Sequence, residues 1–275
     1  MTDEKSANYI SIASGKGGVG KTLTAINLAL ALRRLGFRTA IFDGDLGMAN
    51  VDVLLGLRPR FTINHVVEGE ATLSDVLLEG PEGIMIVPGG SGVAQIANLS
   101  LTRRIALLDQ LNASFADFDY VIVDSGAGLS DTVTHLNTIA DDVIVVTTPE
   151  PHAMTDAYAF IKVMSEKHGV SGCHLLVNQT LSTNQGQQTT QRICEVAEKY
   201  LNISVNALGA VPFEDMLGRL VMNQSVSHEM FSHTRAGEAW FEIAKKLSAK
   251  AKKNEDRQAS WENFVFPQHH GMLRI

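Results

Sequence analysis

A glycine-rich loop near the start of the chain carries the residues best suited to chemistry. Residues 15–22 read GKGGVGKT. Glycines let backbone N–H groups close around phosphate oxygens. Lys21 can reach the β- and γ-phosphates of a nucleotide, and the Thr22 hydroxyl can ligate Mg²⁺. The residues that we expect to hold phosphate are Gly15, Lys16, Gly17, Gly18, Val19, Gly20, Lys21 and Thr22.

The segments on either side give this loop the context that it requires. Residues 9–13 form an apolar run before it, and Leu23, Ile26 and Leu30 recur at helical spacing after it, until Gly36. A strand, a glycine loop and a helix in this order are typical of a phosphate-binding loop. The positive end of the helix dipole then points at the phosphates.

Three aspartates follow two further apolar runs. Asp43 and Asp45 come after residues 39–42, and Asp124 comes after residues 120–123. Carboxylates at the carboxyl ends of parallel strands can face a nucleotide crevice. Asp43 and Asp45 project to one side of an extended segment, so one can organise Mg²⁺ while the other orients the attacking water. Asp124 has the position of a Walker B acid that holds the magnesium shell.

Strands alternate with helical segments along the chain, which predicts an α/β fold with a mostly parallel twisted sheet and helices on both faces. The chain has 275 residues, 45% hydrophobic and 19% charged, as in a soluble protein with one large core. We expect an ATPase domain over residues 1–247, ending in a helix over residues 237–247, and a polar linker with an aromatic tail over residues 248–275. Cys173 and Cys194 form no CxxC pair, which favours small buried side chains over metal ligands.

The charge and hydropathy of the chain indicate where in the cell the protein works and whether it contacts DNA or a membrane. The net charge of −7 disfavours broad DNA binding, and the absence of a signal peptide or a long apolar run predicts a reducing cytoplasm. In the tail, a charged stretch precedes Trp261, Phe264 and Phe266, a composition typical of an interfacial membrane segment. Pro267 would cut a helix short there. Weak contact with the inner face of the cell membrane and docking of the tail onto the core both remain open.

Lys16 distinguishes this loop from an ordinary phosphate-binding loop, which does not require lysine at that position. The run GKGGVGKT resembles the deviant Walker A loop of the MinD/ParA family of ATPases. The resemblance implies that Lys16 crosses a homodimer interface to the partner's nucleotide, and that it acts in catalysis with Lys21. It also implies that Asp45 positions the attacking water and that Asp43 lies near Mg²⁺. Gly126 departs from the Pro or Ala that family members often carry.

The same resemblance implies contacts to the rest of the nucleotide. Glu150 is the implied ribose contact and Asn178 the implied adenine contact, with a helix cap or turn as the alternative for Asn178. Residues 209–214 match the family loop whose backbone reads the adenine edge, which adds Pro212, Phe213 and Glu214. No Asn-Lys-x-Asp string, the guanine-specificity motif of GTPases, occurs in the chain. ATP with Mg²⁺ is therefore the expected ligand.

Within the family, the chain is most similar to the FlhG/FleN regulators of flagellar number. The similar segments are residues 46–57, 66–69, 73–77, 86–92 and 150–162. The similarity implies a slow regulatory ATPase that dimerises with ATP and controls flagellar number and placement. An FlhF-like GTPase and a flagellar transcription regulator or C-ring protein are the implied partners.

Four alternatives remain open at this point. A MinD-type regulator of the division site is the main one, and a ParA-type partition ATPase is disfavoured by the acidic charge. An ATP-dependent small-molecule synthetase would have a related fold, but Lys16 argues against it. A scaffold that binds ATP without turnover is disfavoured by the presence of Asp45 and Asp124.

Overall fold

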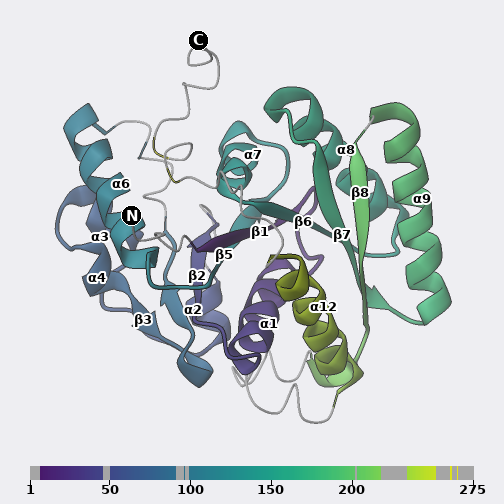
Figure 1. Ribbon diagram of the computed structural model, residues 1–275, viewed down its shortest axis with the longest axis horizontal. Coiled ribbons are helices and arrows are strands. Elements are labelled where there is room, and N and C mark those ends of the chain that lie inside the picture. The colour runs from purple at the N-terminus through teal and green to yellow at the C-terminus, as the bar shows by residue number, and fades with distance from the viewer. Residues whose placement is uncertain are drawn as a thin grey trace.

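A single mixed sheet forms the centre of the computed structural model, which describes residues 7–45, 50–90, 96, 99–201, 203–217, 234–251, 261 and 265 (Figure 1). Its strands are β1 (Asn8–Ser14), β2 (Thr39–Gly44), β3 (Leu78–Glu79), β4 (Met85–Val87), β5 (Tyr120–Ala127), β6 (Asp142–Thr147), β7 (Gly172–Thr180) and β8 (Ser204–Pro212). In the described residues they are ordered β3-β4-β2-β5-β1-β6-β7-β8, and every neighbouring pair is parallel except β3 with β4. The carboxyl ends of the central strands therefore meet at one edge.

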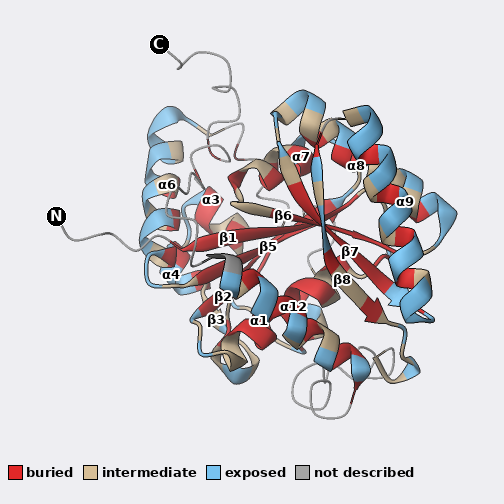
Figure 2. Ribbon diagram, turned by 45° about the vertical axis from the view of Figure 1, so that its right-hand side comes forward, coloured by how far each residue is buried: buried red, intermediate tan, exposed pale blue. Residues whose placement is uncertain are grey.

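Helices cover both faces of this sheet (Figure 2). They are α1 (Lys21–Arg34), α2 (Val51–Leu54), α3 (Ile63–Glu68), α4 (Leu73–Val76), α6 (Leu101–Phe115), α7 (Asp131–Leu136), α8 (Pro151–His168), α9 (Thr183–Leu201) and α12 (Arg235–Ala251), with short 3₁₀ turns η1 (Pro81–Gly83) and η3 (Asn137–Ile139). Alternate residues of β1 face opposite sides: Ile10 and Ile12 pack with α1 and α12, whereas Tyr9 packs with α6 and Ala13 with α8. The α/β fold predicted from the sequence is confirmed.

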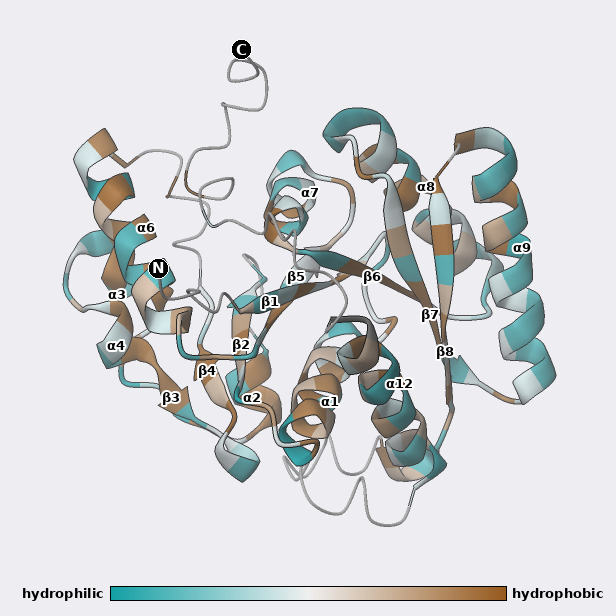
Figure 3. Cartoon of the chain, viewed as in Figure 1, coloured by the Kyte–Doolittle hydropathy of each residue, from teal (hydrophilic) through white to brown (hydrophobic). Residues whose placement is uncertain are grey.

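The apolar pattern explains why these helices lie where they do. Hydrophobic residues gather on the strands and on α1, while the outer side of α9 is polar (Figure 3). In α12, the apolar residues Trp240, Ile243, Ala244 and Leu247 recur at helical spacing and are buried. The helix is longer than predicted, because it runs from Arg235 to Ala251 rather than over residues 237–247. It therefore extends into the stretch expected to be a linker.

One aromatic residue of the tail lies in the core. Trp261 is 1% exposed and stacks on Phe115, with 5.5 Å between ring centroids. Its indole Nε1 donates a hydrogen bond to the Tyr9 hydroxyl at 3.0 Å, and Val265 is also buried. Phe264 and Phe266 are outside the described residues. For Trp261, the structure therefore shows docking onto the core.

The two cysteines differ in their surroundings. Cys173 is buried as expected, and burial raises the pKa of its thiol to about 12. Cys194 is only partly buried, because it lines a groove beside β8, and its thiol lies 3.5 Å from the Val205 carbonyl oxygen. Both are free thiols. Within the described part of the chain, no helix combines the length and the apolar character needed to cross a bilayer.

Candidate nucleotide-binding site

The predicted phosphate loop connects β1 to α1 at the carboxyl edge of the sheet. Gly20 precedes the first turn of α1 and has φ of 93°, a left-handed conformation that favours glycine. No side chain caps this end of α1, and its first turn contains no acidic residue. The positions where Gly17 and Gly18 would carry a Cβ face open space. The helix start can therefore receive an anion.

Neighbouring elements fix the two ends of the loop. A Cβ at Gly15 would overlap the main-chain carbonyl of Asp156 in α8, so this position requires glycine. A Cβ at Gly20 would likewise overlap the side-chain amide of Asn178, at the end of β7. Asn178 Nδ2 donates a hydrogen bond to the Val19 carbonyl at 2.9 Å. The loop is thus held between α8 and β7.

Three side chains lie close together beside the phosphate loop, those of Lys21, Thr22 and Asp124. Lys21 is buried, and burial lowers the pKa of its ammonium, while the nearby Asp124 and Asp45 oppose that shift. The Thr22 hydroxyl donates a hydrogen bond to the carboxylate of Asp124. Burial, together with the charge of Asp43, raises the pKa of Asp124 to about 8. A cation bound beside this buried carboxyl group would stabilise its charged form.

Asp43 is the strand neighbour of Asp124, because β2 and β5 pair at these two residues. Its Oδ2 accepts hydrogen bonds from the main-chain N–H groups of Asn50 and Val51 at 3.0 and 3.2 Å, and its Oδ1 accepts one from Asp45 at 3.1 Å. Burial raises the pKa of Asp43 to about 6, against these hydrogen bonds. Asp43 therefore holds the segment that follows β2, next to the carboxylate of Asp124.

These residues fit a magnesium ion that shares its ligands with phosphate. Asp124 Oδ1 is buried and has no hydrogen-bond partner among the described atoms, and it lies beside the hydroxyl of Thr22. Magnesium prefers such oxygen ligands and commonly uses one or two carboxylates with phosphate oxygens and water. No cluster of three or more His, Cys, Asp or Glu side chains that could hold a metal occurs in the described residues.

Asp45 lies at the entrance to this site. Its charge acts on both Lys21 and Asp124. A Cβ at Gly126 would lie 3.7 Å from Asp45 Oδ1 and 3.2 Å from a methyl group of Val133. Glycine at this position, near the end of β5, therefore gives the strand room beside Val133. Residues 46–49, which follow Asp45 and belong to the similarity noted above, are outside the described residues.

Lys16 points away from the loop in which it lies. Its Nζ pairs with Glu150 Oε2 at 3.2 Å, and both side chains are exposed. Glu150 immediately precedes α8, so this pair joins the loop to the start of that helix. An exposed pair of this kind contributes little to stability and is readily broken.

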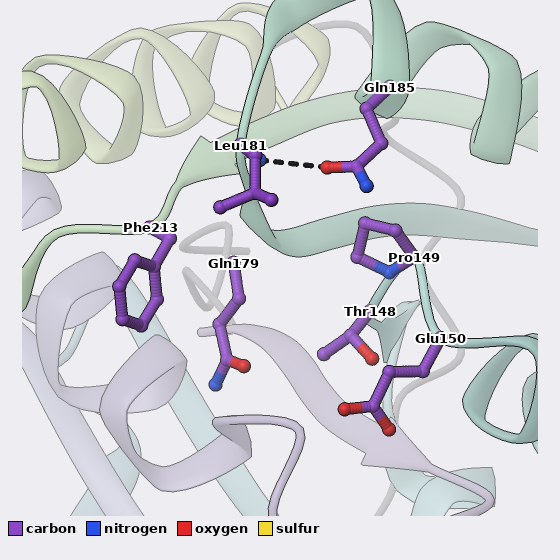
Figure 4. A pocket seen from close by; sticks show the side chains of 7 residues that line it. All are labelled: Thr148, Pro149, Glu150, Gln179, Leu181, Gln185 and Phe213. Atoms are coloured by element: carbon purple, nitrogen blue, oxygen red, sulfur yellow. Dashed lines mark hydrogen bonds between the residues drawn. The ribbon is translucent and has the colours of Figure 1, made fainter.

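A pocket of about 300 Å³ opens beside the loop (Figure 4). Glu150 and Phe213, both predicted nucleotide contacts, line it. Five further residues line it that the sequence analysis did not identify, namely Thr148, Pro149, Gln179, Leu181 and Gln185. Asn178 is buried beneath it, against the phosphate loop.

Two predicted contacts lie elsewhere. Glu214 turns toward α12, where its Oε1 accepts a hydrogen bond from the main-chain N–H of Arg235 at 2.9 Å and pairs with the Arg235 guanidinium at 3.4 Å. Pro212 lines a different groove, between α9 and α12. The structure therefore brings neither side chain to the 300 Å³ pocket.

The chain is similar in sequence to known proteins. Over residues 5–248 the chain matches the family described as ParA: NUBPL iron-transfer P-loop NTPase. It is 37% identical over 240 residues to the antiactivator FleN of Pseudomonas aeruginosa, covering 87% of this chain and 86% of that protein. It is 32% identical over 243 residues to the flagellum site-determining protein YlxH of Helicobacter pylori, covering 88% and 82%.

A solved structure supports the fold. The septum site-determining protein MinD of Pyrococcus horikoshii, complexed with Mg-ADP, superposes with a TM-score of 0.70 at 23% identity, covering 90% of this chain and 99% of that one. The family match and the relatives extend over the phosphate loop, the carboxylates and the sheet that positions them. The chain therefore belongs to the ParA/MinD family of P-loop ATPases, with ATP and Mg²⁺ as its nucleotide and metal.

Proposed function

We propose that this protein is a slow ATPase that dimerises with ATP and, as a switch, restricts flagellar number and placement. The observation that carries the proposal is Lys16, whose ammonium lies outside its own phosphate loop, on the exposed carboxylate of Glu150. A lysine placed there is free to reach a second subunit. The flagellar role is supported by the identity to FleN and to YlxH over most of the chain.

The geometry of the site supports a division of labour among its residues. Main-chain N–H groups at the start of α1 and the ammonium of Lys21 bind the phosphates. Thr22 and Asp124 would hold Mg²⁺, which would neutralise phosphate charge, and Asp43 fixes the segment that carries Asp45. Asp45, at the entrance, orients the water that attacks the γ-phosphate.

Assembly is the step that Lys16 controls. In the dimer, Lys16 leaves Glu150 and contacts the phosphates of the partner's nucleotide, so ATP becomes part of the interface. ATP binding and dimerisation must then favour each other by the same factor. Loss of the γ-phosphate removes this contact and returns the protein to the monomer.

The partners that we propose are an FlhF-like GTPase and a flagellar transcription regulator or C-ring protein. The test is a pull-down with the Asp45→Ala variant loaded with ATP, compared with the same variant loaded with ADP. Recovery of flagellar proteins with ATP only is the expected result. Recovery of division proteins would instead establish the MinD-type role, and recovery of DNA the ParA-type role.

The tail adds a further regulated contact. Trp261 is buried against Phe115 and bonded to Tyr9, so it can reach an anionic lipid surface only after leaving the core. We propose that ATP dimerisation releases it, and that two weak tails then bind together more tightly than one. Flotation with anionic liposomes should recover the full chain with ATP but not with ADP. Deletion from Ser260 onward should abolish recovery, and no flotation of the ATP form would limit the tail to its docking role.

A further inference from the structure

The strand β8 is the last strand on one side of the sheet, and within the described chain it pairs only with β7 (Figure 1). The Ser204 N–H donates toward β7, to the Ser171 carbonyl at 3.2 Å. Because main-chain groups of successive residues in a paired strand point alternately to its two sides, the N–H groups of Val205 and Ala207 face away from β7. Ala207 is exposed, and β8 contains no charged residue. This side of β8 is therefore open to a further strand.

A groove of about 840 Å³ lies along this open side. Its floor contains the small residues Ala207, Gly209 and Ala210 of β8. One wall is an uncharged face of α9, which includes Gln187 and Gln191, and the other wall is α12. The same edge of a second copy would be flanked by its own two helices, so the two strands could not come together. The groove therefore fits a single extended peptide chain.

Two charged side chains of α12, Glu238 and Lys246, line the groove. Lys246 Nζ donates to the Leu208 carbonyl at 3.0 Å, and the ion pairs of α12 within the described residues use Arg235 and Lys245 instead. Eight residues of helix span about 12 Å, which is about four residues of an extended strand. Side chains four residues apart in a strand point to the same face. One extended peptide can therefore place an acidic group at Lys246 and a basic group at Glu238.

We propose that β8 accepts an extended segment of a partner protein as a further strand, selected by an acidic and a basic residue four positions apart. Main-chain hydrogen bonds to the open edge supply affinity, and the contacts to Lys246 and Glu238 supply selectivity. The register with β7 shifts at Leu208, and Lys246 covers the carbonyl of that residue, so the edge is protected against unselective pairing. An acidic residue of the partner draws Lys246 away from it.

The groove also has a defined place relative to the nucleotide. Leu181 lines both this groove and the 300 Å³ pocket beside the phosphate loop. A segment bound along β8 therefore ends next to the nucleotide pocket. The proposal goes beyond the flagellar role and does not depend on it.

The experiment uses two synthetic peptides labelled with fluorescein, TSEVTVKST and TSKVTVEST. Both carry one glutamate and one lysine four residues apart, in opposite order, among residues that favour strands. Binding to the full chain is measured by fluorescence anisotropy. The key variant combines Lys246→Glu with Glu238→Lys. The matched control combines Glu242→Lys with Lys245→Glu, because these two residues of α12 pair with each other at 2.6 Å and do not line the groove.

The parent protein should bind one peptide about tenfold more tightly than the other, because the wrong order brings like charges together. The key variant should reverse this preference, and the matched control should keep it. Hydrogen exchange at the Val205 and Ala207 amides should slow when the preferred peptide is bound, since both amides then donate to it.

Several results would overturn the proposal without touching the ATPase assignment. Binding of neither peptide, equal binding of both, or an unchanged preference in the key variant would refute it. Slow exchange at Val205 and Ala207 that appears without peptide as the protein concentration rises would show that a second copy occupies the edge. Slow exchange in dilute protein without peptide would show that another part of the same chain fills the groove.

Discussion

Replacing Asp124 with asparagine should stabilise the nucleotide-free protein. Asp124 is 1% exposed, and burial beside Asp43 raises its pKa from the ordinary 3.8 to about 8. An acid whose pKa is higher in the folded state binds more protons there than in the unfolded chain, so stability falls as the pH rises from 3.8 to 8. Each pKa unit is worth about 1.4 kcal/mol. Between pH 6 and pH 8, this one group should therefore remove about 2 kcal/mol from the free energy of unfolding.

Urea denaturation in EDTA at pH 6, 7 and 8 measures this effect. Asp124→Asn has no charge to desolvate, and its side-chain oxygen can still accept the hydrogen bond from Thr22, so its stability should change much less over this interval. Asp117→Asn is the matched control, because the Asp117 side chain is 81% exposed. Mg²⁺ with ATP should stabilise the parent but add little to Asp124→Asn. Parallel pH profiles for the parent and Asp124→Asn, or a variant less stable than the parent at pH 8, would refute the reasoning.

Three further variants test the rest of the site and the core. Lys21→Ala should abolish nucleotide binding, because it removes a charged contact to the phosphates, whereas Asp45→Ala should bind ATP without hydrolysing it; equal loss of ATP affinity in calorimetry would contradict this division. Gly15→Ala should lose ATP binding because its methyl group would overlap α8, whereas Gly17→Ala should fold normally, and equal thermal stability and affinity of the two would disprove the packing argument. Trp261→Ala should lower the free energy of unfolding by about 3–5 kcal/mol in urea denaturation, and a loss below about 1 kcal/mol would show that the tail is not part of the core.

Local patterns predicted the catalytic part of the site well. The glycine loop needs no distant partner to be recognised, and a parallel sheet brings the ends of its strands together wherever they lie in the chain. For this reason, Lys21, Thr22, Asp43 and Asp124 were expected near one another, and the structure places them there.

Contacts set by tertiary packing were harder to predict. The sequence around an aromatic residue such as Trp261 looks the same whether the side chain enters lipid or a protein core. Its contacts with Tyr9 and Phe115, which only the fold creates, show that it lies in the core. The main chain of residues 209–214 is predicted to contact adenine, but the sequence did not predict that the Glu214 side chain bonds to Arg235 at the start of α12. Gln179 was missed because a left-handed backbone at glutamine leaves no mark in the sequence.

Sedimentation of the Asp45→Ala variant tests the central claim most directly. This variant should retain ATP, and Lys16 should then join two subunits, so its mass should double in ATP and remain that of a monomer in ADP. Adding Lys16→Ala should restore the monomer in ATP without unfolding the protein, because the Lys16 side chain is exposed and, among the described residues, pairs only with Glu150. The same mass in ATP and in ADP would contradict the switch.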